Sequence, residues 1–312
     1  MRIAFVGKGG SGKTTLAGLF ARFLAEACFP VIAIDADINQ HLGRTIGMTD
    51  QEIQQVPQLG NHLIELKQFL RGDNPRITTA EKMLKTTPPG RGSMLLTIQG
   101  PNQVWNRFTR VCHGIRLLVA GQFEHEDVGV KCFHAKTGGI ELVLNHTVDG
   151  AGEYLLVDMT AGADAFASGL FTRFDLTCIV VEPTWKSVSV FQQYRSFAEE
   201  YGVRLGIVAN KITNTDDLAY IEAQTGVKPI AVFSQSNVIT RMERGEAIEI
   251  DNQIRDGLKA IQHTLDTVPK NWPLFYQRAK EFHIKNALSW GNTSTGEDVT
   301  KQIDPDFTYP QK

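Results

Sequence analysis

Nine residues near the start of the chain have the composition and spacing of a phosphate-binding loop. The segment Gly7-Lys-Gly-Gly-Ser-Gly-Lys-Thr-Thr15 matches G-x-x-x-x-G-K-T, follows an apolar run and opens a helical pattern. Its glycines let backbone N–H groups and the helix N-terminus face phosphate oxygens. Lys13 can then bridge the terminal phosphates of a nucleotide, and the Thr14 hydroxyl can bind Mg²⁺. The residues expected to contact the nucleotide here are Gly9, Gly10, Ser11, Gly12, Lys13, Thr14 and Thr15.

Three aspartates that close apolar runs are candidates for the chemistry around those phosphates. Asp35 and Asp37 are two positions apart, so both can face the metal and the phosphates if the strand continues that far. Asp158 closes another apolar run and is expected to hold Mg²⁺ through water. Gly162 follows it, and a glycine there would let a peptide turn its N–H toward the γ-phosphate and release it after hydrolysis.

Asn210 and Lys211 end a further apolar run and are candidates for contacts with the nucleotide base. An asparagine amide can both donate to and accept from a purine edge. A guanine-specific N-K-x-D pattern would require an aspartate where Thr213 stands. Because threonine supplies no carboxylate for the guanine donors, the sequence favours adenine, and hence ATP.

The elements that must position these residues follow from the periodicity. Short apolar runs lie at residues 3–6, 31–34, 115–120, 154–157, 177–181, 205–209 and 230–233, and amphipathic stretches include residues 14–27 and 187–201. This β-α order predicts an α/β fold with a mostly parallel sheet and helices on both faces. In such a sheet the candidate residues lie at the carboxyl ends of the strands, where ligands bind.

Two segments depart from the alternation. Residues 43–113 are rich in proline and glycine, and we interpret them as an elaboration on the core. We assign residues 1–268 to a P-loop ATPase domain and residues 269–312 to a helical extension with a polar tail. The tail, from about Asn292, is expected to be frayed.

Composition limits the classes of partner. The chain has 312 residues and a formal net charge of -2, which gives no overall attraction to nucleic acid or anionic lipid, so we expect neither as a partner. Four widely spaced cysteines imply no disulfide framework. No signal peptide opens the chain, and no run approaches the roughly 20 apolar residues of a membrane span. We therefore expect a cytoplasmic protein.

Lys8, beside the glycines, completes the pattern K-G-G-x-G-K-T-T, which resembles the deviant Walker A ATPases of the MinD, ParA and nitrogenase iron protein group. In that group the extra lysine reaches the partner's nucleotide, so the resemblance implies an ATP-dependent homodimer with Lys8 and Lys13 as catalytic cations. It also implies that Asp37 orients the attacking water and that Asp35 supports the magnesium shell set up by Thr14 and Asp158.

The segments Asp158-Met-Thr-Ala-Gly162 and Val181-Glu-Pro-Thr-Trp-Lys-Ser187 resemble the CooC family, accessory ATPases that mature the nickel site of carbon monoxide dehydrogenase. The resemblance implies a client metalloenzyme. CooC proteins carry a C-x-C at their dimer interface, whereas Val130 stands here in place of the first cysteine. Cys132 and His134 from two subunits could still gather a Zn²⁺ or Ni²⁺ ion, but a loop cysteine beside a surface histidine is the simpler interpretation, since two ligands from one chain make no site.

Other functions on the same fold stay open. A ParA- or MinD-type positioning ATPase would bind DNA or membrane, yet the end of the chain cannot form the basic amphipathic helix of MinD. An iron-sulfur carrier would need a C-terminal C-x-x-C, which is absent. A small-molecule synthetase or kinase would need a substrate pocket, which residues 43–113 could form.

Overall fold

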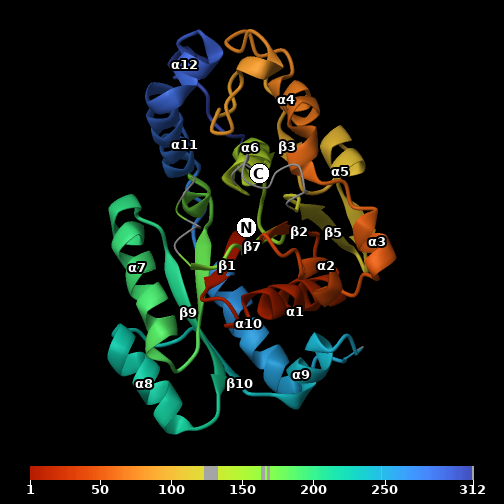
Figure 1. The fold of residues 1–312 in the computed structure, drawn as a ribbon, viewed down its shortest axis with the longest axis vertical. Coiled ribbons are helices and arrows are strands. Elements are labelled where there is room, and N and C mark those ends of the chain that lie inside the picture. Colours follow the sequence, from red (N-terminus) through yellow and green to blue (C-terminus); the bar gives the residue numbers. More distant parts are fainter. Residues whose placement is uncertain (123–132, 163–165, 167–168, 247, 311–312) are drawn as a thin grey trace.

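The computed structural model describes residues 1–312 except 123–132, 163–165, 167–168, 247 and 311–312, and it contains a long twisted sheet between two layers of helices (Figure 1). Eight strands of the described residues form this sheet in the order β10-β9-β8-β1-β7-β2-β5-β4. They are β1 (Arg2–Gly7), β2 (Val31–Ala36), β4 (Arg110–Cys112), β5 (Ile115–Val119), β7 (Tyr154–Met159), β8 (Leu176–Val181), β9 (Leu205–Ile212) and β10 (Ala231–Ser234). All pair in parallel except β4, which is antiparallel to β5 at the edge. The predicted α/β class is confirmed.

Helices cover both faces of the sheet. Their bounds are α1 (Lys13–Glu26), α2 (Leu42–Thr45), α3 (Asp50–Gln54), α4 (Leu63–Arg71), α5 (Gln103–Phe108), α6 (Phe133–His146), α7 (Trp185–Tyr201), α8 (Thr215–Thr225), α9 (Asn237–Glu243), α10 (Asn252–Asp266), α11 (Trp272–Asn286) and α12 (Asn292–Thr295). Helices α1 and α10 pack into one core cluster, and α4 to α8 contribute to the other. Among the described helices, none is both long and apolar enough to cross a membrane.

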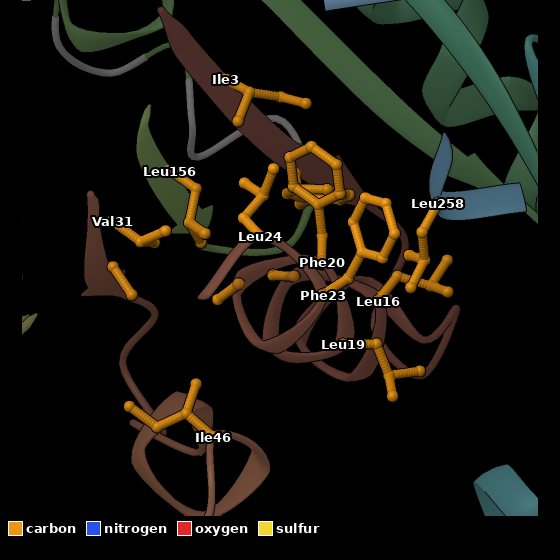
Figure 2. Packing of buried hydrophobic residues seen from close by; sticks show 14 of the residues in the cluster. Ile3, Leu16, Leu19, Phe20, Phe23, Leu24, Val31, Ile46, Leu156 and Leu258 are labelled. Atoms are coloured by element: carbon orange, nitrogen blue, oxygen red, sulfur yellow. The ribbon is translucent and has the colours of Figure 1, made fainter. Parts of the chain in front are cut away.

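The strands form where they do because both of their faces are buried. Ile3 and Phe5 point into the cluster with α1 and α10, whereas Ala4 and Val6 point into the opposite cluster. Phe5 packs against Phe20 of α1 with ring centroids 5.8 Å apart. Figure 2 shows Ile3 of β1, Leu156 of β7 and the apolar face of α1 meeting in this layer. This packing fixes the end of β1 against the start of α1.

The segment from 43 to 113 consists of short helices and strands, and its interpretation as an elaboration on the core stays a prediction. It contains four short helices, α2 to α5, and its strand β3 (Leu96–Thr97) pairs with β6 (Thr147–Val148) in a separate two-stranded sheet. Its last strand, β4, caps the sheet edge next to β5. Trp105 of α5 is fully buried and donates from Nε1 to the Thr97 carbonyl at 2.8 Å, which joins α5 to β3.

The expectation of a frayed tail after Asn292 is wrong. Tyr309 is buried and donates to the Asn145 carbonyl at 2.6 Å, and its ring stacks on Trp272 of α11 at 4.5 Å. Gln302 is also buried and accepts from Thr87 at 2.9 Å. Val299, Phe307 and Tyr309 supply enough apolar contact to order this mainly polar stretch, which its average polarity conceals. The division at residue 268 stays a prediction.

His146, at the end of α6, carries a pH dependence of the fold. It is fully buried, its Nδ1 lies 2.9 Å from the Leu142 carbonyl, and its Nε2 has no partner among the described residues. Burial lowers its pKa from 6.5 to about 4, against the opposing effect of the Leu142 contact. In the unfolded chain His146 takes up a proton more readily than in the folded protein. The contribution of the neutral, buried His146 to the free energy of unfolding is therefore complete above pH 6.5 and is lost as the pH falls toward 4.

We therefore expect His146→Leu to reduce the acid sensitivity of folding. Between pH 7 and pH 5 the wild-type histidine should lower the free energy of unfolding by about 2 kcal/mol, a loss that leucine cannot suffer. Urea denaturation at the two pH values gives the change in the free energy of unfolding for each protein, and these two changes are compared. An identical pH dependence for the two proteins would show that His146 is protonated at the same pH in both states.

Candidate nucleotide-binding site

The predicted phosphate loop connects β1 to α1 and ends at Gly12, whose φ of 94° lies in the left-handed region. Helix α1 begins there without a side-chain cap, whereas α7 and α10 begin with Thr184 and Asp251 side chains that accept backbone N–H groups. The Ser11 N–H donates to the Lys8 carbonyl at 3.0 Å and closes the turn of the loop. Because its cap supplies no acceptor, the start of α1 is suited to phosphate oxygens.

Two consecutive side chains at the end of β9 hold two consecutive carbonyls of the loop. Asn210 Nδ2 donates to the Ser11 carbonyl at 2.7 Å, and Lys211 Nζ donates to the Gly10 carbonyl at 2.6 Å. With these carbonyls directed toward β9, the neighbouring N–H groups can face the phosphates. The contact of Asn210 and Lys211 with the nucleotide stays a prediction, and this bracing of the loop is a role that the sequence pattern did not reveal.

The predicted catalytic and magnesium residues come together at the carboxyl edge of the sheet. Strands β2 and β7 are neighbours, and their register places Asp35 beside Asp158. Lys13 forms an ion pair with Asp37, and its Nζ lies 3.6 Å from Asp158 Oδ1. Thr14 Oγ1 donates to Asp158 Oδ2 at 2.6 Å. Two carboxylates thus flank one ammonium group, and the third, Asp35, lies beside Asp158.

Burial governs the protonation of these groups. It raises the pKa of Asp158 to about 6 and that of Asp35 well above its ordinary range, where repulsion from Asp158 adds to the effect. Burial also opposes ionisation of Asp37, but the Lys13 ammonium and the Asn39 N–H outweigh it and lower the pKa of Asp37. Asp35 and Asp158 therefore lack a neighbouring positive charge that would fully compensate their ionised forms.

This imbalance fits a divalent cation. Asp158 Oδ1 is buried and accepts no hydrogen bond from the described residues. Mg²⁺ prefers oxygen ligands, which the Thr14 hydroxyl and the Asp158 carboxylate would supply beside the phosphates. When bound, the ion offsets the charge of the transferring phosphate. Within the described ranges, no group of three or more His, Cys, Asp or Glu side chains is placed to hold a metal ion by itself.

The remaining predicted residues lie around this centre. Lys8 is partly exposed, and its Nζ is 3.6 Å from Glu182 Oε2 at the end of β8. We assigned Glu182 no role from the sequence, because a single carboxylate after a strand carries no signal until its partners are known. Gly162 has a left-handed φ of 71°, and an added Cβ would meet no atom of the residues that the structure describes within 4 Å, which suits the predicted peptide turn.

The proposed transition-metal site cannot be placed. Cys132 lies outside the described residues, and His134 is in the first turn of α6 with only its backbone described. The binding of Zn²⁺ or Ni²⁺ by this pair stays a prediction.

The fold and the loop define a P-loop nucleotide-binding protein. The model of the CobQ/CobB/MinD/ParA nucleotide binding domain, CbiA, matches residues 3–253, so the chain belongs to this family. It is 29% identical over 223 residues to the carbon monoxide dehydrogenase accessory protein CooC of Rhodospirillum rubrum, which covers 71% of this chain and 78% of that protein. It is 26% identical over 266 residues to an uncharacterized ATP-binding protein of Methanocaldococcus jannaschii, 84% of this chain and 96% of that protein.

Solved structures agree with this family. A ParA family ATPase from Chlorobium tepidum TLS superposes with a TM-score of 0.56 at 17% identity, over 83% of this chain and 97% of that one. MinD from Pyrococcus horikoshii OT3, complexed with Mg-ADP, superposes with a TM-score of 0.54 at 15% identity, over 85% of this chain and 96% of that chain. At these identities the likeness shows the fold. The resemblance to the MinD and ParA ATPases and to CooC, predicted from the loop and strand ends, is confirmed.

A matched pair of glycine substitutions tests the loop geometry. We expect Gly12→Ala to lower the free energy of unfolding by about 1–3 kcal/mol and to weaken nucleotide binding, because φ is left-handed and a Cβ would overlap the Asn210 amide nitrogen. Gly9→Ala is the control for stability alone, since a Cβ there meets no atom of the described residues within 4 Å. Urea denaturation and ADP titration measure the two effects, and equal stability of the two variants would refute the geometry.

Proposed function

We propose that the protein is a magnesium-dependent ATPase that alternates between a monomer and an ATP-bound homodimer and acts as an accessory factor for a client enzyme. The observation that carries the proposal is the grouping of Lys13, Asp37, Asp158 and Thr14 beside a loop that also presents Lys8. Family membership supports nucleotide binding, and the residues themselves support hydrolysis.

Arrival of a nucleotide would exchange the partner of Lys13. Its ammonium is paired with Asp37, and phosphate oxygens would compete for the same cation. Released from Lys13, Asp37 keeps the backbone N–H of Asn39 at 3.0 Å as an orienting contact. Its free carboxylate oxygen could then accept a proton from the attacking water and orient it.

Lys8 would complete the site of the second subunit. The contact of Lys8 with Glu182 is long and lies partly in solvent, so moving Lys8 away costs about 0–1 kcal/mol. A second cation on the phosphates would neutralise the charge that develops as the γ-phosphate transfers, which is a strong electrostatic effect away from water. This makes hydrolysis depend on dimerisation.

The kind of client enzyme is inferred from the similarity to CooC of Rhodospirillum rubrum. The Rhodospirillum rubrum protein is named as an accessory protein of carbon monoxide dehydrogenase, and it shares 29% identity with this chain over 223 residues. We propose a metalloenzyme client for this protein too, with nickel insertion as the assisted step.

Substitution of Lys8 separates binding from dimerisation. We expect Lys8→Ala to bind ATP within about threefold of the wild type, because one partly exposed charge contributes little to binding, and to abolish ATP-dependent dimers. Mass in solution is measured with ADP and with ATP, in the Asp37→Ala background to block turnover. Lys259→Ala, on an exposed face of α10, is the matched control. Loss of ATP binding in Lys8→Ala would place Lys8 in its own subunit's site instead.

Metal content tests the client class. With Cys132 and His134 shared across a dimer, we expect about one Zn²⁺ or Ni²⁺ per two chains in the ATP form, lost in Cys132→Ser. Elemental analysis of the separated dimer measures it. ATP-dependent dimers without metal would keep the switch and would direct the search for a client away from metalloenzymes.

A small-molecule synthetase or kinase is the second candidate, favoured by a cleft. It holds about 770 Å³ beside Thr14, and the 43–113 segment lines it with Arg44 and Gln54. Gln40 also lines it, with a left-handed φ of 50° and a buried amide nitrogen that has no hydrogen-bond partner in the described part of the chain. Stimulation of ATP turnover by a panel of small carboxylates and amines would favour this function over the switch.

A further inference from the structure

Glu182 lies between the two lysines that flank the phosphate loop. It follows β8, which is flanked in the sheet by β1 and β9. Lys8 comes from the loop after β1, and Lys211 comes from the end of β9. One carboxylate therefore faces two cations that belong to the nucleotide site, at the edge where the phosphates are expected.

The two contacts are unequal. Lys211 Nζ donates to Glu182 Oε1 at 2.6 Å and also to the Gly10 carbonyl at 2.6 Å, so it links the carboxylate to the loop. Lys8 Nζ lies 3.6 Å from the other oxygen, Oε2, beyond hydrogen-bond distance. The link to Lys211 is a charge-assisted hydrogen bond, whereas the contact with Lys8 is a looser ion pair.

Glu182 itself is held in place. Its side chain is 12% exposed, and its backbone N–H donates to Ser187 Oγ at 3.0 Å in the first turn of α7. Thr184 caps that turn by accepting the N–H of Ser187. Glu182 is thus held between the sheet and α7. Its contact with Lys8 can therefore break while its contact with Lys211 stays in place.

The strained conformation of Lys211 agrees with this arrangement. Its φ of 60° is left-handed, which a residue with a side chain adopts only when its surroundings impose it. It coincides with a bulge in β9, where Ala209 and Ile212 pair with Val232 and Ser234 of β10, and the ammonium lies between a carboxylate and a carbonyl.

We propose that Glu182 is a positioning residue with two tasks. Through Lys211 it holds the Gly10 carbonyl and so keeps the loop in its phosphate-binding form. Through its looser contact it retains Lys8 on its own subunit until the phosphates of a second copy of this chain compete for it. The second task rests on the proposed ATP-dependent dimer, whereas the first does not.

The first task is tested on ADP binding, which needs no dimer. Glu182→Ala should weaken ADP binding about three- to tenfold, as loss of one charge-assisted hydrogen bond to the loop implies. Glu182→Gln keeps an acceptor for Lys211 and should stay within about threefold of the wild type. Glu200→Gln, an exposed change on α7, is the matched control. If Glu182→Ala binds ADP like the wild type, the bracing is refuted.

The second task is tested by the reactivity of the lysine amines. In the nucleotide-free protein, reductive methylation followed by mass spectrometry should label Lys8 about two- to fivefold faster in Glu182→Gln, relative to Lys259, because the retaining charge is gone. With saturating ATP in the Asp37→Ala background, the dimer dissociation constant should fall by a similar factor.

Unchanged labelling of Lys8 in Glu182→Gln would refute its retention by Glu182. If the labelling rises but the protein without substitution at Glu182 forms no dimer with ATP, the proposed switch fails while the contact of Glu182 with Lys8 stands.

Discussion

The Lys13 ammonium lies between Asp37 and Asp158, with Asp35 buried beside Asp158, and this excess of negative charge is the constraint around which the site is built. Water cannot compensate the two fully buried carboxylates, so burial disfavours their ionised forms. The incomplete compensation also makes the site receptive to a cation, which would in turn attract phosphate.

The opposite edge of the same sheet shows the contrast. There Asp149 is also buried, but Arg2, Lys270 and the N-terminal amine surround it, and these charges outweigh burial and hold its pKa well below its ordinary range. Arg2 also lies over the ring of Phe275 at 4.2 Å. The amino edge thus carries paired charges that attach the helical extension, whereas the carboxyl edge keeps unpaired charges for a ligand.

The nucleotide-binding domain of the family and the C-terminal helices beyond it correspond to these two edges of the sheet. The family match ends at residue 253, so α11 and the segment after it lie beyond it. These additions pack through the aromatic cluster of Trp272, Tyr276, Phe307 and Tyr309 at a distance in sequence from every predicted site residue. These contacts attach the additions to the domain.

Much of this protein was determined by local sequence. The strands were predicted from apolar runs because both of their faces are buried, and the phosphate loop was predicted because only glycines allow its backbone path. Asp35, Asp37 and Asp158 were identifiable because parallel strands bring their carboxyl ends to one edge.

Other features depend on contacts between residues far apart in the chain, and only the tertiary structure decided them. The order of the tail depends on Tyr309 meeting Trp272, and the role of Glu182 depends on Lys8 and Lys211 arriving from two other strands. Local periodicity reports burial and backbone form within one segment. It does not indicate which polar groups will contact one another in the folded protein, and those contacts set the charge and the chemistry of this site.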